Sequence, residues 1–187
     1  MPDILFEDRL SLTIDGLRVD LFAAVGETTD CLIVWLPDHK IALVSNLFGP
    51  LFPHFPNVNT IRGDKYRFVE PQLATNRFVR ELRPEILITG RYEAIVGAEL
   101  IEASLERLHN AVVYVHEEAL KGFNAGVDMW TLMDKIELPP ELRVGQGYGK
   151  VSWAVRTFWE EYVGWFKLES TTEFYPDSAP AALAELL

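Results

Sequence analysis

The chain has 187 residues, 49% of them hydrophobic and 24% charged, so it can form one or two folded domains but not a large multidomain enzyme. This balance is typical of a globular protein and excludes intrinsic disorder over the whole chain. Acidic residues outnumber basic ones 28 to 17, which gives a formal net charge of −11. Because an acidic chain without a basic block repels phosphate backbones, we expect no nucleic-acid partner.

The single cysteine, Cys31, excludes an intrachain disulfide framework and a thiolate cluster within one chain. It lies in an apolar run, residues 31–36, which favours a packed core thiol over a nucleophile. The first residues contain no basic region followed by an apolar stretch, and no window approaches the ~20 apolar residues of a membrane span. We therefore expect a cytoplasmic protein that does not interact with a membrane.

The first half of the sequence has the patterns of strands. Apolar residues alternate with other residues on both sides of Asp15-Gly16, which predicts a β-hairpin over residues 10–21. A second pair of strands is predicted at 31–36 and 41–44, joined by a tight reversal at 37–40. Both of these strands are almost entirely apolar, so we expect them to be buried on both faces.

Three prolines and two glycines interrupt residues 45–63, which predicts a long irregular loop of the kind that is often functional. A helix is predicted from about Asp64, broken or kinked at Pro71, resuming through Leu82 and ended by Pro84. A short buried strand at 86–88 then leads into a turn at 89–92.

The second half is predicted to be almost entirely helical. A first long helix carries an apolar stripe, and further apolar residues widen it, so we expect this helix to pack on two sides. The stripe is Ile101, Leu105, Leu108, Val112, Val115 and Ala119, and the widening residues are Leu100, Ala111 and Tyr114. Asp128 is predicted to cap a short helix that extends through Ile136.

A last helix is predicted over residues 148–166. Its stripe is Val151, Val155, Phe158, Tyr162 and Trp165, and further apolar residues are Trp153, Trp159, Val163 and Phe166. This apolar surface exceeds what one core-facing side needs, so we expect a second contact surface, formed by the Trp-rich helix in a homodimer. The tail after Thr172 is expected to be frayed.

The four histidines lack the spacing of a metal site, because no His-x-His pair and no i, i+4 pair occurs. His109 and His116 lie two turns apart on one helix and are interpreted as surface or interface residues. His39 lies in a predicted turn. His54 lies in the proline-rich loop, where both a structural and a functional role stay open.

Two further segments contain residues of the kind found in binding sites. Residues 145–149, Gly-Gln-Gly-Tyr-Gly, are interpreted as a turn, because no strand precedes them and no lysine follows at the spacing of a phosphate-binding loop. In the stretch 57–63, the Arg62 guanidinium and the Asn57 amide are donors suited to an oxyanion. The alternative is that Arg62 ties the loop to the body of the domain.

The sequence also resembles a known family. Residues 138–142, 147–156 and 162–166 resemble the helical dimerisation region of the alkyl sulfatase group within the metallo-β-lactamase superfamily. Upstream, four segments match the second half of the hydrolase domain of that superfamily in order. They are Gly26–Asp30, Leu47–Pro50, Asn57–Gly63 and Thr89–Arg91. The resemblance covers about residues 5 to 175.

The resemblance implies an α/β fold, namely the second half of an αββα sandwich followed by an all-α dimerisation domain. The family fold stacks two sheets between outer helices, and each half of the chain contributes one sheet. The implied division is 1–95 for the half sandwich, 96–175 for the helical domain and 176–187 for a tail. The implied chemistry is cleavage of a sulfate ester of a long-chain alcohol at a site with two zinc ions.

This sequence departs from the family at the metal ligands. The first-half cluster His-x-His-x-Asp-His does not occur in it. Asn46 stands where the family has an acidic ligand, and Arg91 where it has a histidine. Because an amide is a weak ligand and a guanidinium has no lone pair to donate, we predict no metal cofactor for this chain alone. Asn57 and Arg62 match the sulfate-binding residues of the family, although Asn59 replaces the aromatic residue between them.

Three functions remain open. The first is a truncated or degenerate alkyl-sulfatase-like protein that does not hydrolyse sulfate esters by itself. The second is a non-catalytic dimerisation or anion-sensing module that pairs with a partner chain supplying the N-terminal half. The third is an active hydrolase with an unrecognised site, for which His54, Asn57 and Arg62 are the first candidates.

Overall fold

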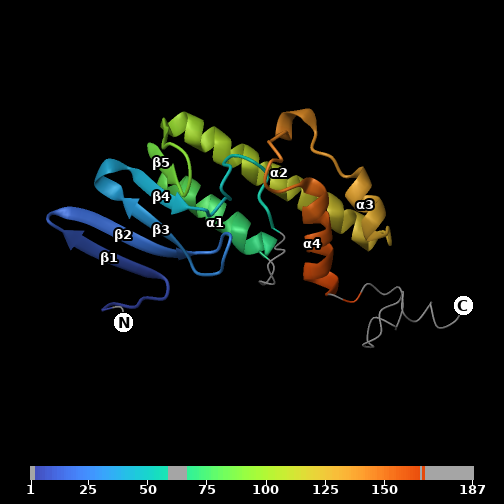
Figure 1. Ribbon diagram of the computed structural model, residues 1–187, viewed down its shortest axis with the longest axis horizontal. Helices are drawn as coiled ribbons and strands as arrows, with labels where there is room; N and C mark the ends of the chain where they lie inside the picture. Colours follow the sequence, from blue (N-terminus) through green and yellow to red (C-terminus); the bar gives the residue numbers. More distant parts are fainter. Residues whose placement is uncertain (1–2, 59–66, 165, 167–187) are drawn as a thin grey trace, which may run out of the picture.

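The structure is a computed structural model that describes residues 3–58, 67–164 and 166. A six-stranded sheet is followed by a set of helices (Figure 1). The strands are β1 (Arg9–Ile14), β2 (Leu17–Ala24), β3 (Cys31–Leu36), β4 (Ile41–Ser45), β5 (Ile86–Thr89) and β6 (Ile95–Val96). The α-helices are α1 (Val69–Leu82), α2 (Ala98–Asn124), α3 (Met129–Lys135) and α4 (Val151–Val163).

The strands lie in the sheet in chain order, and all neighbours are antiparallel except β4 and β5. Asp15 and Gly16 have φ values of 50° and 83°, as the two-residue hairpin turn requires, so the predicted hairpin is confirmed. Helix α1 connects the parallel strands β4 and β5. Strand β6 was not predicted, because two residues are too few to show a period.

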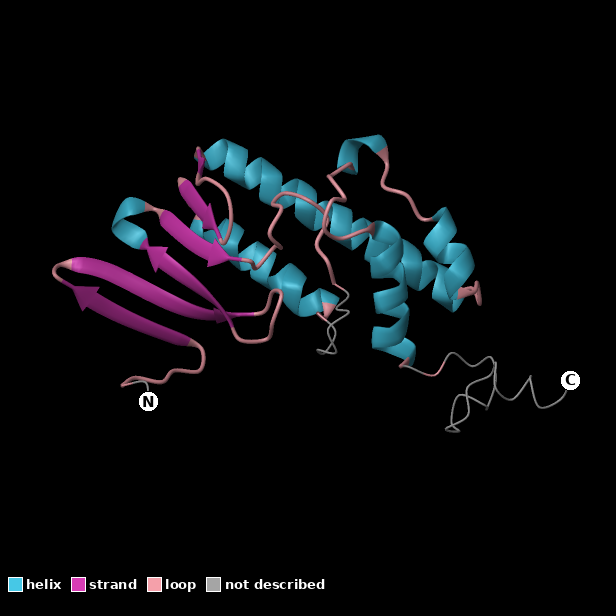
Figure 2. Ribbon diagram, in the orientation of Figure 1, coloured by secondary structure: helices cyan, strands magenta, loops and turns pink. Residues whose placement is uncertain are grey.

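One face of the sheet is covered by α1 and α2, which lie together to one side of it (Figure 2). Ile33, Val44 and Leu87 are fully buried on this covered face, where they pack with Val79 of α1 and Ile101 of α2. The residues of β3 and β4 that alternate with them are half-buried or exposed. The prediction that these two strands are buried on both faces is therefore wrong.

The opposite face carries only aliphatic side chains, and no helix of the described residues covers it. We call it the open face. By strand register it comprises Leu10, Leu12, Ile14, Leu17, Val19, Leu21, Ala23, Leu32, Val34, Leu36, Ile41, Leu43, Ile86, Ile88 and Val96. Ile14 and Val96 are 58% and 68% exposed, and most of the central residues are half-buried.

Helix α1 begins at Val69, and the expected start near Asp64 lies outside the described residues. Pro71 is the third residue of the helix. It does not break the helix, which is continuous from Val69 to Leu82, because backbone N–H groups in the first turn have no intrahelical partner to lose. The helix ends at Arg83, which adopts a left-handed conformation just before Pro84.

Helix α2 joins two hydrophobic cores. Ile101, Leu105 and Leu108 of its predicted stripe pack in the sheet core. The stripe residues from Val112 to Ala119 pack in a helical core with Val155 and Phe158 of α4. The whole stripe is buried, as predicted. Leu100, which was expected to widen the apolar surface, is instead 58% exposed. Because α2 belongs to both cores, the division of the chain near residue 95 stays a prediction.

The short helix α3 begins at the predicted cap, where a carboxylate oxygen of Asp128 accepts the N–H of Thr131 at 2.9 Å. Helix α4 begins three residues later than predicted, after the extended Lys150, and ends early because Gly164 adopts a positive φ. Three residues of its predicted stripe are buried, but Tyr162 is 51% exposed and Trp165 lies outside the described residues. Among the described helices, none is both long enough and apolar enough to cross a bilayer.

Candidate functional site

Three connections leave the sheet at the end where strands β2, β4 and β5 have their carboxyl termini, and we call this end the candidate edge. Strands β2, β4 and β5 run in the same direction, because β2 and β4 are each antiparallel to β3 and β4 is parallel to β5. The segments that follow these strands are 25–30, 46–58 and 90–94. Open sheets with parallel strands bind ligands just outside the carboxyl ends of those strands. The described parts of the four upstream segments that carry the family resemblance all lie at this edge, which is therefore the candidate site.

Two glycines allow these connections to touch. Gly26 lies so close to Leu47 that any side chain on Gly26 would overlap the Leu47 backbone. The Gly90 N–H donates to the Ser45 carbonyl at 2.8 Å, and a side chain on Gly90 would overlap the Asn46 amide oxygen. The edge is thus held together by close backbone contacts that only glycine permits.

Asn46 and Arg91, the two residues at the family's ligand positions, follow neighbouring parallel strands. The Asn46 amide oxygen is buried and has no hydrogen-bond partner among the described residues, whereas the Arg91 side chain is exposed. The structure therefore places a residue with a neutral acceptor and a residue with a permanent cation just after two neighbouring strands.

Arg67 is a residue of this edge that the sequence did not reveal. Its guanidinium donates to the Glu27 carbonyl at 2.8 Å, to the Glu27 carboxylate at 3.3 Å and to the Asn57 carbonyl at 2.6 Å. Arg67 and Glu27 have only 12% and 17% of their side chains exposed, so this ion pair is largely shielded from water. Arg67 thereby ties the turn after β2 to the backbone of Asn57. Its partner Glu27 is 40 residues away, a separation that carries no sequence signal.

The sequence instead pointed to Arg62, which lies outside the described residues. Asn57 is described and lies at the candidate edge, held through its carbonyl by Arg67. Cys31, at the start of β3, is half-buried with its sulfur 3.4 Å from the Thr28 hydroxyl, so it is less enclosed than the predicted core thiol.

The glycine-rich segment 145–149 packs against the proline-rich loop. The Phe55 N–H donates to the Gly145 carbonyl at 2.7 Å, and the Gly147 N–H donates to the Nδ1 atom of His54 at 3.1 Å. A side chain on Gly145 would overlap the His54 ring, and one on Gly149 would overlap the Pro56 carbonyl. The segment is irregular and follows no strand, in agreement with its interpretation as a turn. His54 therefore has a structural role as an acceptor in this contact.

The remaining histidines lie apart from the edge. His116 is buried between α2 and α4, where its Nε2 atom is 2.8 Å from the Tyr162 hydroxyl. Burial lowers the pKa of His116, and the nearby Glu70 opposes this shift. Burial also lowers the pKa of His109, as do Arg77 and Arg80. His116 is thus not the surface residue that the sequence suggested, because it is enclosed within the chain, whereas His109 is half-buried. His39 lies in the predicted turn between β3 and β4.

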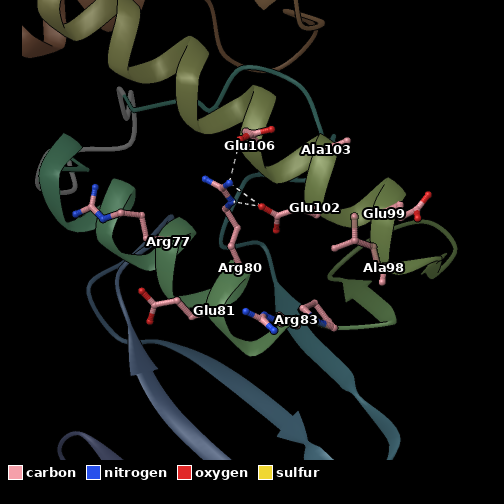
Figure 3. A pocket seen from close by; sticks show the side chains of 11 residues that line it. Arg77, Arg80, Glu81, Arg83, Ala98, Glu99, Glu102, Ala103 and Glu106 are labelled. Carbon is pink, nitrogen blue, oxygen red and sulfur yellow. Dashed lines mark hydrogen bonds and ion pairs between the residues drawn. The ribbon is translucent and has the colours of Figure 1, made fainter.

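A groove of about 760 Å³ lies between α1 and α2, away from the candidate edge (Figure 3). Arg80 of α1 crosses it to bind Glu102 at 2.6 Å and Glu106 at 3.2 Å. Arg77 and Arg83 line the same groove. These contacts hold the two helices together over the covered face, so we assign the groove a structural role.

Comparison with known proteins identifies the relatives of this chain. No family model matches the sequence. The linear primary-alkylsulfatase of a Pseudomonas species is 29% identical over 171 residues, which are 89% of this chain and 32% of the relative. The structure of a variant of the sec-alkyl sulfatase PisA1 from a Pseudomonas species matches with a TM-score of 0.82 and 21% identity, over 98% of this chain and 30% of that one.

A metallo-β-lactamase family protein from Thermus thermophilus matches with a TM-score of 0.56 and 16% identity, over 87% of this chain and 50% of that one. The fold is therefore part of a metallo-β-lactamase-like domain, joined to a helical part. The curated relatives that match in sequence are an alkylsulfatase and an alkyl/aryl-sulfatase, so the sequence is similar to the alkyl sulfatase group. It spans about a third or less of the length of the curated relatives that it matches.

Proposed function

We propose that this chain is an alkyl-sulfatase-like portion that binds a sulfate-type anion at the edge of its sheet and does not hydrolyse sulfate esters by itself. One observation carries the proposal. Asn46 and Arg91 occupy the ends of the neighbouring strands β4 and β5, in the positions where the resemblance places metal ligands. The Ser45–Gly90 hydrogen bond fixes these two strand ends relative to each other.

The residues at this edge do not fit a pair of zinc ions. Zinc takes histidine, cysteine or carboxylate ligands, whereas Asn46 offers one neutral amide oxygen and Arg91 offers none. Among residues 3–58, 67–164 and 166, no three His, Cys, Asp or Glu side chains lie close enough together to hold a metal ion. The exposed Arg91 guanidinium would also repel a divalent cation. Hydrolysis by this chain alone therefore lacks its metal centre.

The same chemistry favours an anion. Arg91 is a permanent cation beside the sheet edge, and Asn57 is held at that edge by Arg67 through its carbonyl. The resemblance adds Arg62 as a second guanidinium on the loop that follows Asn57. Guanidinium groups match the geometry of sulfate and phosphate oxygens with paired donors.

Metal content and hydrolysis test the first part of the proposal. The purified chain, incubated with zinc and then desalted, is analysed for bound metal by mass spectrometry and assayed with octyl sulfate. We expect no stoichiometric zinc and no release of sulfate above the blank. Two zinc ions per chain together with turnover would overturn the proposal.

Calorimetric titration with sulfate tests the second part. Charge-assisted hydrogen bonds contribute about 1.5–3 kcal/mol, so removal of one guanidinium should weaken binding at least about tenfold. We expect this loss for Arg62→Ala and Arg91→Ala. Arg83→Ala, in the groove between α1 and α2, is the control and should leave the affinity unchanged. Equal affinities for all three variants would remove the edge as the anion site.

The helical part favours a second candidate function, that of a dimerisation module. Trp130, Trp153 and Tyr162 on α3 and α4 are between 42% and 51% exposed. Aromatic side chains of this size are enriched at protein interfaces. The substitution Trp153→Lys should lower the self-association of the chain in light scattering if this surface forms a homodimer.

A further inference from the structure

Helix α2 passes from one hydrophobic core to the other at His109. Leu108, just before it, packs in the sheet core, and Val112, one turn after Leu108, packs in the helical core. A small cavity of about 10 Å³ lies at this junction, between α2, α1 and the proline-rich loop. Its apolar wall consists of Phe48, Pro56, Leu73, Leu108 and Val112. All five of these residues are buried, so the cavity is largely shielded from bulk solvent.

Three polar residues complete the wall of this cavity, Gln72 and Asn76 on α1 and His109 on α2. Gln72 and Asn76 are four residues apart and therefore lie on the same side of α1. They are 6% and 3% exposed. The Gln72 Oε1, Asn76 Oδ1 and His109 Nδ1 atoms are buried, and none has a hydrogen-bond partner among the described residues. One cavity thus gathers three polar atoms that burial has removed from bulk water.

Buried polar atoms without a partner destabilise a fold, so such atoms in native proteins are nearly always paired with protein or with internal water. The Asn76 amide cannot solve this by turning over. Its Nδ2 atom donates to the Leu105 carbonyl of α2 at 3.2 Å, and that carbonyl can only accept. The Asn76 Oδ1 atom therefore remains an acceptor that needs a donor from the cavity.

A single water molecule fits both the volume and the chemistry of the cavity. An internal water needs a volume of roughly 10–15 Å³ and about two to four polar partners. Water can donate to two acceptors, which are the amide oxygens of Gln72 and Asn76. It can also accept one hydrogen bond from His109, provided that Nδ1 carries the proton. The donors and acceptors then balance for all three side chains.

The surrounding charges disfavour a metal cation as the occupant. Burial is the largest cause of the lowered pKa of His109, and Arg77 and Arg80 lower it further, whereas Glu70 opposes them. The two guanidinium groups would also repel a cation held beside the imidazole. With a lowered pKa, His109 is neutral near pH 7, and only one of its ring nitrogens carries a proton.

We infer that Gln72, Asn76 and His109 form an internal binding site for one water molecule, and that this water holds His109 in its neutral Nδ1–H tautomer. The water joins α1 to α2 at the place where the two cores meet. Phe48 and Pro56 of the proline-rich loop lie against the same cavity, and Asn57 of the candidate edge follows Pro56 directly. The site does not depend on whether the chain binds an anion.

Nuclear magnetic resonance of the full chain at pH 8 tests the inference. The nitrogen chemical shifts of the His109 ring identify its tautomer, and we expect a protonated Nδ1 and an unprotonated Nε2. Cross-relaxation with water should also reach the methyl groups of Leu73 and Val112, which are only 4% and 3% exposed and are not in contact with bulk solvent. Both measurements use the unmodified chain, so neither depends on the folding of a variant.

Substitutions to apolar residues test whether the polar atoms hold the water. The double variant Gln72→Met with Asn76→Leu keeps similar side-chain volumes but leaves His109 as the single polar partner. The water contact at Val112 should then be lost, because an internal water needs at least about two partners. Leu73→Met, on the apolar wall of the same cavity, is the matched control, and it should leave that contact within about twofold of the unmodified chain. Circular dichroism shows whether each variant has folded.

Four results would overturn the inference. A proton on Nε2 of His109 would make Nδ1 a third acceptor, and one water has only two hydrogens to donate. The absence of water contacts at the Leu73 and Val112 methyl groups would exclude an internal water. Persistence of the Val112 contact in the folded double variant would place the water elsewhere. A saturable shift of the His109 signals with sodium or potassium chloride would identify a cation as the occupant.

Discussion

The two hydrophobic cores of the molecule differ in how completely they are closed. The helical core is surrounded by α1, α2, α3 and α4, and Phe158, Ala154 and Val115 within it are fully buried. Within the part of the chain that the structure describes, the sheet core is closed on one side only, because α1 and α2 cover one face and no described helix covers the open face. Helix α2 contributes to both cores.

The difference shows that apolar sequence and burial need not coincide. Strands β3 and β4 are almost entirely apolar, yet only alternate residues in them are buried. In the helical core, the residues of the α2 stripe from Val112 on are all buried, as their apolar pattern predicts. An excess of apolar residues over burial therefore marks a face without a covering layer among the described residues, and substitutions on the two faces should behave differently.

The largest expected effect contrasts neighbouring residues of β5. Leu87, on the covered face, is fully buried, whereas Ile88, on the open face, is half-buried. Leu87→Ala should lower the free energy of unfolding by about 2–5 kcal/mol because it leaves a cavity, and Ile88→Ala by less than about half of that. Urea unfolding of the chain alone measures both. Equal losses would show that the open face is as well packed as the covered one.

The second prediction concerns the link between the sheet and the loop of Asn57. Arg67→Met keeps much of the side-chain volume but removes three hydrogen bonds, one of them to the Glu27 carboxylate. Because Glu27 is 17% exposed and would lose its cation, we expect a loss of about 2–3 kcal/mol in unfolding free energy. Arg18→Met, on the hairpin, is the control with an exposed arginine and should cost clearly less.

Much of the fold could be predicted from local patterns. The Asp15-Gly16 hairpin, the stripe of α2 and the Asp128 cap each depend on residues close in sequence, and all three are confirmed. The continuity of α1 through Pro71 could not be foreseen, because it depends on where the helix begins. Strand β6 exists only because β5 supplies its hydrogen bonds.

The candidate site was only partly predictable for the same reason. The resemblance pointed to Asn46, Asn57 and Arg91. The strand order brings Asn46 and Arg91 to one edge, and Arg67 holds Asn57 there through its carbonyl. The Arg67 clamp and the docking of residues 145–149 on His54 join segments far apart in the sequence, and neither leaves a periodic signal. The glycines of that segment were visible, but the reason for them is a close backbone approach that only the structure reveals.

The third prediction tests that approach between the two halves of the molecule. Gly145→Ala should cost about 1–3 kcal/mol, because the added methyl group overlaps the His54 ring. His54→Ala removes the ring and the acceptor of the Gly147 N–H, and we expect it to recover part of that cost when combined with Gly145→Ala. A double-mutant cycle from urea unfolding measures the coupling energy. Strictly additive losses of unfolding free energy would mean that the His54 ring is not the cause of the cost of Gly145→Ala.

The smallest expected effect is a pH dependence that arises in the closed helical core. Burial lowers the pKa of His116 in the folded chain. In the unfolded chain His116 is protonated below about pH 6.5, whereas in the folded chain it becomes protonated only at a lower pH. The His116 contribution to stability is therefore complete above that pH and declines as the pH falls towards the lowered pKa.

Two other buried groups also contribute to the pH dependence. The pKa of His109 is lowered in the same direction, whereas the pKa of Glu161 is raised by burial, so Glu161 affects stability in the opposite sense. The comparison of the unmodified chain with His116→Gln separates the His116 contribution from both, because the glutamine keeps a partner for Tyr162 but does not titrate. Urea unfolding between pH 7.5 and 5.0 should show a shallower loss of stability for the variant, and parallel curves would exclude His116 as the titrating group.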